Sequence, residues 1–246
     1  MKHILITLKD ITESGGGERV CANLANAFSE NGYKVTIISL FSLNRTPVFD
    51  IKNDISIKIL SKSTPTTKNI FKKLFCKSIY RSYLCYKIDR MIKRIKPDIV
   101  LANDGWFIPK QKVQNVKYLR LWHLNMPNKM NNRKIENLNR FDTLILISGY
   151  ELSKWQKYHN NIKVIPNFLP NIPTISSDSK NNVVLSIGRL SKEKGFLRLI
   201  DIWDIIKQDE RAKGWKLVIV GSGEMQEIIE SKIKAKALLY YIPYIN

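Results

Sequence analysis

The sequence of 246 residues has little that could hold a metal and no apolar run long enough to cross a membrane. Its three cysteines, Cys21, Cys76 and Cys85, lack the paired spacing of a zinc site and are typical of reduced thiols in a cytosolic protein. No uninterrupted apolar run approaches the roughly 18 residues of a membrane-spanning helix. The apolar run in residues 1–10 is interrupted too soon for a signal peptide. We therefore expect a cytoplasmic globular protein without a bound metal.

The common catalytic motifs are also missing. No G-x-x-x-x-G-K-[ST] loop, H-E-x-x-H, C-x-x-C or G-x-S-x-G occurs, which excludes P-loop ATPases, zincins, zinc ribbons and α/β-hydrolases. There is no D-x-D, and hence no obvious carboxylate cage for a metal-bound nucleotide.

Acidic residues are scarce relative to basic ones. The chain has 21 Asp and Glu against 41 Lys and Arg, a net charge of +20. Such an excess indicates an anionic partner, and nucleic acid, an acidic membrane surface and phosphorylated substrates all fit it.

Strand and helix signals alternate along the chain and predict an α/β protein with parallel sheets. We expect a complete Rossmann-like domain at 1–168, a Pro-, Ser- and Asn-rich linker at 169–182 and a partial second Rossmann-like domain at 183–246. The second region is shorter than a usual domain of about 100 to 150 residues. It shows two strand patterns, at 183–187 and 216–220, and ends in an apolar tail. We therefore expect a truncated domain with an open sheet edge.

A short apolar strand from Val183 ends at Gly188 and leads into a cationic loop. Arg189 and Lys194 lie in this loop, just before an amphipathic helix that begins near Phe196. A helix N-terminus favours an anion, and two cations add charge-assisted hydrogen bonds. The loop is therefore a candidate phosphate site; the alternative is a solvated loop that carries charge incidentally.

A glycine-rich turn, Gly15 to Gly17, follows the first predicted strand and precedes a helix. Without Cβ atoms the backbone could approach a ligand closely at the head of this helix. Gly221 begins a similar turn, but Gln226 stands where a third glycine would be needed. Neither turn has the G-x-G-x-x-G spacing, so both are weak evidence for dinucleotide binding.

His123 lies just beyond the predicted strand 116–122, at the edge where open α/β sheets bind ligands. A catalytic role and a purely structural one are both open for it. Farther on, Ser148 and Glu151 have the spacing of a capping box and are interpreted as structural.

Residues 68–96 predict one long helix with ten Lys and Arg and a single acid, Asp89. Such a basic amphipathic helix can lie on an anionic bilayer. The candidates for membrane contact are Lys72, Lys73, Lys77 and Arg81. The alternative is a helix packed on the core with a solvated basic face.

Taken together, these motifs resemble glycosyltransferase family 4. The resemblance rests on the order and spacing of five segments, at 15–20, 122–125, 164–167, 186–195 and 217–224. It implies a GT-B architecture of two Rossmann-like domains and a retaining transfer of sugar from a nucleotide-diphosphate sugar. It also implies no metal or other cofactor, the nucleotide sugar being a co-substrate. A glutamate-containing stretch of the family's second domain has no counterpart here.

The resemblance also implies roles for individual residues. Arg189 and Lys194 would hold the donor diphosphate, the amides of Gly15 and Gly16 would reach it, and His123 would lie by the transferred sugar. Further candidates for the donor cleft are Asn167, Gly188 and Gly221.

The expected acceptor is a glycan or a lipid-linked sugar. The expected setting is surface polysaccharide or glycolipid synthesis on the inner face of a membrane. Two alternatives stay open: an inactive remnant or subunit that needs a partner chain, and a basic nucleic-acid-binding protein.

Overall fold

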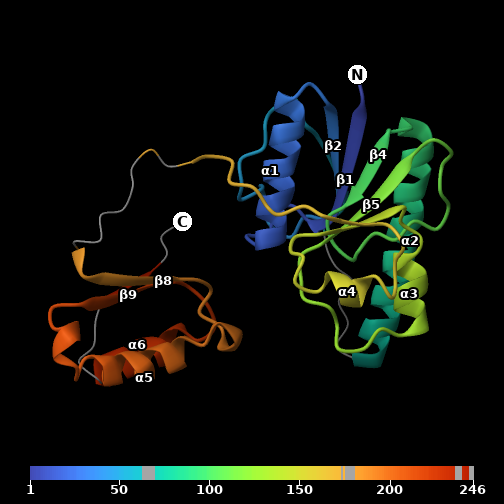
Figure 1. Ribbon diagram of the computed structural model, residues 1–246. Helices are drawn as coiled ribbons and strands as arrows, with labels where there is room; N and C mark the ends of the chain where they lie inside the picture. The colour runs from blue at the N-terminus through green and yellow to red at the C-terminus, as the bar shows by residue number, and fades with distance from the viewer. Residues whose placement is uncertain (63–69, 173, 175–180, 236–239, 244–246) are drawn as a thin grey trace. The chain divides into compact units, whose positions relative to one another are not determined.

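The chain divides into two units in a computed structural model, Met1–Ile172 and Pro173–Asn246 (Figure 1). The structure describes residues 1–62, 70–172, 174, 181–235 and 240–243, and for 70–77 and 240–243 it describes the backbone only. The division falls within the Pro-, Ser- and Asn-rich segment 169–182.

The first unit is built on a parallel sheet of seven strands in the order β3-β2-β1-β4-β5-β6-β7. The strands are β1 (His3–Asp10), β2 (Lys34–Phe41), β3 (Ser56–Ser61), β4 (Ile99–Ala102), β5 (Lys117–Trp122), β6 (Thr143–Leu146) and β7 (Ile162–Val164). β1 pairs with β2 on one side and β4 on the other, so the strand order reverses between β1 and β4. Ligands of open α/β sheets bind at the carboxyl edge beside such a reversal.

Helices cover both faces of this sheet, α1 (Gly16–Glu30) on one and α2 (Ile70–Ile95) on the other (Figure 1). Successive side chains of β1 alternate between the faces. Leu5 packs with Leu84 and Ile88 of α2, whereas Ile6 packs with Cys21 and Ala25 of α1. The long basic helix expected from the sequence is therefore present, and one of its faces belongs to the core.

Two shorter helices lie beyond β5 and β6. α3 (Asn132–Leu138) begins at Asn131, whose side chain accepts a hydrogen bond from the Lys134 amide at 2.9 Å. α4 (Leu152–Trp155) buries Trp155 against Leu144 and Leu146. The sequence does not predict α3, because the segment is short and polar.

The second unit has a parallel sheet in the order β10-β9-β8. Its strands are β8 (Val183–Ile187), β9 (Lys216–Gly221) and β10 (Tyr240–Pro243). The helices α5 (Phe196–Ile206) and α6 (Gln226–Ala235) pack on one face of it around Ile200, Trp203, Leu217 and Ile219. The expectation of two strands was wrong, because 240–243 pairs with β9.

The described helices include none that is both long enough and apolar enough to cross a membrane.

Ile88 tests the packing of α2 on the sheet, since its side chain is fully buried while Tyr86 nearby is 52% exposed. We expect Ile88→Ala to lower the free energy of unfolding by about 2 to 5 kcal/mol through lost burial and a cavity. Tyr86→Ala should change it by only about 0.5 kcal/mol. Urea denaturation of both variants measures the difference, and equal losses would contradict this packing.

Candidate functional site

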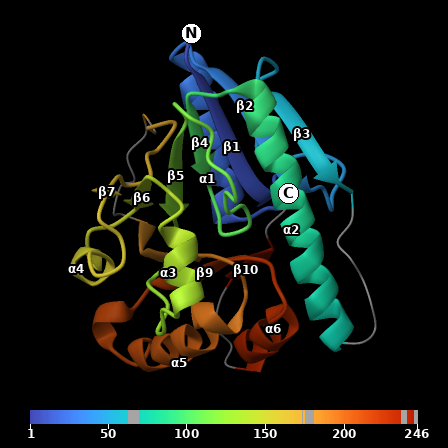
Figure 2. The same cartoon turned by 90° about the vertical axis from the view of Figure 1, so that its right-hand side faces the viewer.

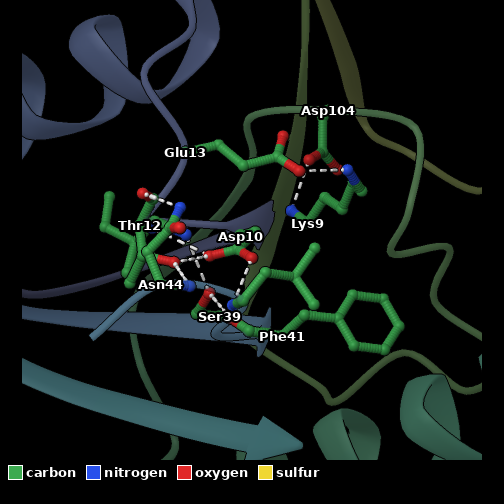
Figure 3. Close-up of polar contacts among 10 residues, drawn as sticks. Lys9, Asp10, Thr12, Glu13, Ser39, Phe41, Asn44 and Asp104 are labelled. Carbon is green, nitrogen blue, oxygen red and sulfur yellow. Dashed lines mark hydrogen bonds and ion pairs between the residues drawn. The ribbon is translucent and has the colours of Figure 1, made fainter. Parts of the chain in front are cut away.

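The turn Asn103–Asp104–Gly105 after β4 connects several elements at the carboxyl edge of the first sheet. The Asp104 carboxylate accepts hydrogen bonds from the backbone N–H of Lys9 at 2.5 Å and of Trp106 at 2.9 Å. The Lys9 ammonium pairs with Glu13 at 2.6 Å (Figure 3). The end of β1 and the turn after β4 are thereby held together.

A second buried network fixes the loop that leads from β1 to the glycine-rich turn (Figure 3). Asp10 is fully buried and accepts hydrogen bonds from the Thr12 amide and hydroxyl at 2.8 and 2.5 Å and from the Leu43 amide at 2.8 Å. Asn44 donates from its side chain to the Thr12 carbonyl at 2.8 Å. The loop after β1 is therefore anchored to the end of β2 before it reaches Gly15.

His123 lies half-buried beyond β5 and contacts Asn103. The Asn103 side-chain nitrogen donates to the Gly17 carbonyl at 2.9 Å, which leaves its oxygen 3.2 Å from His123 Nε2. His123 Nε2 therefore donates to that oxygen. Burial lowers the pKa of His123, and the charge of Arg120 lowers it further. The imidazole is thus neutral at pH 7, with Nδ1 as its acceptor.

The N-terminus of α1 lies on the same edge, because Asn103 bonds to Gly17. Gly15 is the N-cap and no side chain caps the helix there. A Cβ on Gly16 would face open space, whereas one on Gly15 would lie 2.1 Å from the Glu18 carboxylate. The sequence motif contains Glu18, but only the folded helix shows that the Glu18 carboxylate lies beside Gly15.

Glu18 affects what can bind at this helix end. Burial raises the pKa of Glu18, and Glu13 and Asp104 nearby raise it further. An anionic ligand at Gly15 and Gly16 would compete with this carboxylate for the helix N-terminus. Such a ligand is favoured when Glu18 moves away or is protonated.

In the second unit, the loops after β8 and β9 are joined by backbone hydrogen bonds. The amide of Gly188 donates to Val220, and that of Leu190 to Ser222, at 3.0 and 2.8 Å. A Cβ on Gly221 would lie 2.0 Å from the Gly188 carbonyl oxygen, so the close approach of the two loops requires glycine. Gly188 and Gly221 therefore lie together, beside the head of α5.

Arg189 and Lys194 are exposed on the loop between β8 and α5. The loop contains a 3-10 turn, Lys192–Lys194, and passes through Gly195 with φ of 71° into α5, which no side chain caps. Among the residues that the structure describes, neither cation forms an ion pair with a carboxylate. Both cations are therefore available to an anionic ligand.

The other candidate residues lie elsewhere. Asn167 is exposed at a mainly apolar cavity of about 390 Å³ in the first unit, together with Leu24 and Phe28 of α1. Arg81 is half-buried and donates to the carbonyls of Gly105 and Trp106. The side chains of Lys72, Lys73 and Lys77 lie outside the described part of α2.

The capping box expected at Ser148 and Glu151 was wrong. The Ser148 hydroxyl accepts from the Tyr150 amide at 3.3 Å, and the Glu151 carboxylate accepts from the Met126 amide at 2.6 Å. Glu151 instead joins the segment after His123 to α4, a contact over 25 residues that local spacing does not reveal.

Comparison with known proteins identifies the family. The description "Glycosyltransferase Family 4" matches residues 14–170, and "Glycosyl transferases group 1" matches 167–242. The chain belongs to glycosyltransferase family 4. This confirms the family resemblance and the GT-B-type fold, with a Rossmann-like N-terminal domain and a partial C-terminal one.

Two relatives of this family 4 chain are an uncharacterized glycosyltransferase of Haemophilus influenzae and the amylovoran biosynthesis glycosyltransferase AmsD of Erwinia amylovora. They are 27% and 28% identical over 96% and 95% of this chain, and the chain spans 66% of the length of each. The structure of a TarM mutant of S. aureus with Fondaparinux, alpha-GlcNAc-glycerol and UDP shares the fold. Its TM-score is 0.67 at 12% identity, over 100% of this chain and 78% of that one.

The neutral state of His123 gives a pH-dependent prediction. We expect its imidazole to titrate below 6.5 in the folded protein, because burial and Arg120 disfavour the charged form. As pH falls below 6.5, His123 therefore binds a proton more readily in the unfolded chain than in the folded one. The free energy of unfolding decreases as pH falls through this range, and this loss is absent above pH 6.5.

Proton NMR of the imidazole and urea unfolding between pH 5 and 7.5 measure both effects. His123→Gln should flatten this part of the pH dependence. A folded-state pKa at or above 6.5 would contradict the arrangement.

Proposed function

We propose that the protein transfers a sugar, with retention of configuration, from a nucleotide-diphosphate sugar to a glycan or lipid-linked acceptor in surface polysaccharide or glycolipid synthesis. The observation that carries the proposal is the pair of exposed cations, Arg189 and Lys194, before the N-terminus of α5 in a family 4 chain; within the described residues neither forms an ion pair, and the N-cap of α5 is Gly195. The named role of AmsD in amylovoran biosynthesis and the UDP in the TarM structure support it.

The chemistry of the proposed reaction explains why cations are needed. Departure of the nucleoside diphosphate builds negative charge on phosphate oxygens, which a guanidinium binds through paired hydrogen bonds and an ammonium binds as a compact point charge. The amides at the head of α5 and its dipole add to this stabilisation. In this proposal these groups supply the positive charge, with the nucleotide sugar as co-substrate and without a metal or other cofactor.

Residues of the first unit have separate roles in the proposal. His123, neutral and held by Asn103, accepts a hydrogen bond from a sugar hydroxyl through Nδ1. The amides of Gly15 and Gly16 can donate to an anionic group once Glu18 has moved from the head of α1. Both roles depend on a fixed edge, which the hydrogen bonds of Asp10 and Asp104 provide.

The two cations can be tested one at a time. We expect Arg189→Ala and Lys194→Ala each to lower kcat/KM by on the order of a hundredfold or more, because each removes a preorganised donor to the leaving group. Lys192→Ala, an exposed cation of the same loop, is the matched control and should retain activity.

Calorimetric binding of UDP-, GDP- and CMP-linked sugars accompanies the rate measurements. Equal binding by the wild type and by the Arg189 and Lys194 variants would reject this loop as the diphosphate site.

The outer face of α2 supports a further part of the proposal, contact with the anionic inner face of a membrane. Ile79, Tyr83 and Tyr86 are 52 to 55% exposed on it. Lys87 and Arg90 lie 5.7 and 5.9 Å from the centres of the Tyr83 and Tyr86 rings. Aromatic rings beside cations are typical of surfaces that bind lipid headgroups.

Co-sedimentation with vesicles tests this surface. We expect binding to phosphatidylglycerol-containing vesicles at low salt, and weaker binding by Lys87→Gln with Arg90→Gln, since each basic residue contributes about 1 kcal/mol. Arg211→Gln, which removes a cation 91% exposed in the second unit, should have little effect. Equal losses in both variants would contradict a specific role of α2.

A further inference from the structure

A small cavity on the α2 side of the first sheet is lined by basic side chains. It has a volume of about 220 Å³, and residues of α2, α3 and the end of β5 contribute to its lining. Figure 2 shows these three elements in the first unit. Arg81, Arg120 and Lys134 contribute to its walls, and no carboxylate is among the described residues that line it. Most of the other walls are apolar, with Phe107 and Phe141 almost fully buried.

Within the described part of the chain, one hydrogen bond is found for the guanidinium of Arg120. Its side chain is 8% exposed, and the hydrogen bond found for it runs from one terminal nitrogen to the Ala102 carbonyl at 3.4 Å. Its planar group also lies 5.4 Å from the centre of the Trp122 ring. A guanidinium has several N–H donors, so this one hydrogen bond leaves Arg120 donors that can bind a ligand in the cavity.

The nearby Asp104 does not neutralise Arg120 by a direct ion pair. Its carboxylate is occupied by the amides of Lys9 and Trp106, and within the described residues it makes no ion pair with Arg120. Arg81 adds a second guanidinium, which holds the carbonyls of Gly105 and Trp106. Burial lowers the pKa of Arg120 to about 10, despite Asp104, so it stays charged at neutral pH.

We propose that this cavity binds an anionic substituent of the sugar acceptor, a phosphate or a carboxylate. Guanidinium groups bind both through paired hydrogen bonds, and apolar walls strengthen such bonds by excluding water. Pockets for whole drug-sized ligands start at about 300 Å³, so this smaller cavity suits one substituent. Naming the ligand as the acceptor rests on the proposed transferase function.

The position of the cavity fits an acceptor. Arg120 lies three residues before His123 on β5, and the partner of His123, Asn103, begins the turn that carries Asp104 and Gly105. Arg120 faces the α2 side of this turn, and His123 contacts Asn103 on the α1 side. An acceptor anchored by its anion therefore extends past the turn towards His123.

Side-chain NMR of the full chain tests the cavity directly. The signals are the Nε–H of Arg120 and the indole N–H of Trp122, followed during titration with inorganic phosphate, glucuronate and glucose at constant ionic strength. We expect an anion to shift both signals and glucose to shift neither. A shift with phosphate alone identifies a phosphate substituent, one with glucuronate alone a carboxylate; no shift with either overturns the proposal.

Variants separate this cavity from the overall positive charge. Arg81→Met and Arg120→Gln should weaken the binding of the active anion roughly tenfold to hundredfold, the effect of losing a hydrogen bond to a charged group. Arg120→Lys keeps the positive charge but loses the paired hydrogen bonds of the guanidinium. If Arg120→Gln does not fold, the lower anion affinity expected for Arg120→Lys tests the proposal in its place. Arg94→Met, also on α2 but exposed, is the control. Equal affinity in the Arg81, Arg120 and Arg94 variants overturns the proposal.

A parallel titration with UDP distinguishes failure here from failure of the proposed function. UDP should shift the backbone signals of residues 188–195 equally in the wild type and in Arg120→Gln. UDP binding without any anion effect at Arg120 rejects the acceptor cavity alone. GDP and CMP are titrated in the same way, and an anion effect at Arg120 without binding of UDP, GDP or CMP rejects the transferase function and with it the assignment of the ligand as an acceptor.

Discussion

The half-buried Asp104 side chain makes the hydrogen bonds on which the carboxyl edge of the first sheet depends. It accepts the amides of Lys9 and Trp106, which belong to segments about a hundred residues apart in the chain. Burial raises the pKa of Asp104, while these amides and the charge of Arg120 oppose the rise. Because His123 and Arg120 both border this turn, a shift of the turn would displace them together.

Basic residues have two distinct environments in this protein. Arg189 and Lys194 are exposed on a loop, where water screens their charges until a ligand displaces it. Arg120 is already desolvated among apolar side chains and needs no reorganisation before it meets an anion. The net charge of +20 therefore includes cations that differ widely in how strongly water screens their attraction for an anion.

The second unit shows how backbone packing places a loop. Gly188 and Gly221 approach so closely that a side chain on Gly221 would collide with the Gly188 carbonyl. Hydrogen bonds between the two loops then hold Arg189 and Gly195 near the head of α5. On the opposite face of the sheet from α5 and α6, Leu185 and Ile187 are 55 and 66% exposed.

The sequence by itself determined the alternation of strands and helices apart from α3 and β10, the parallel α/β class and the family, because hydrophobic periodicity and motif spacing are local properties. It also located the cationic loop at 189–194, because Arg189 and Lys194 both lie in the single connection between one strand and the next helix. Only the tertiary structure decided that residues 240–243 form a third strand beside β9. It also decided that the Glu18 carboxylate lies beside Gly15 and that the Glu151 carboxylate accepts a hydrogen bond from the Met126 amide. The cavity lined by Arg81 and Arg120 was likewise not predictable from the sequence. Its walls come from α2, β5 and α3, and the folded chain, rather than spacing along it, brings these segments together.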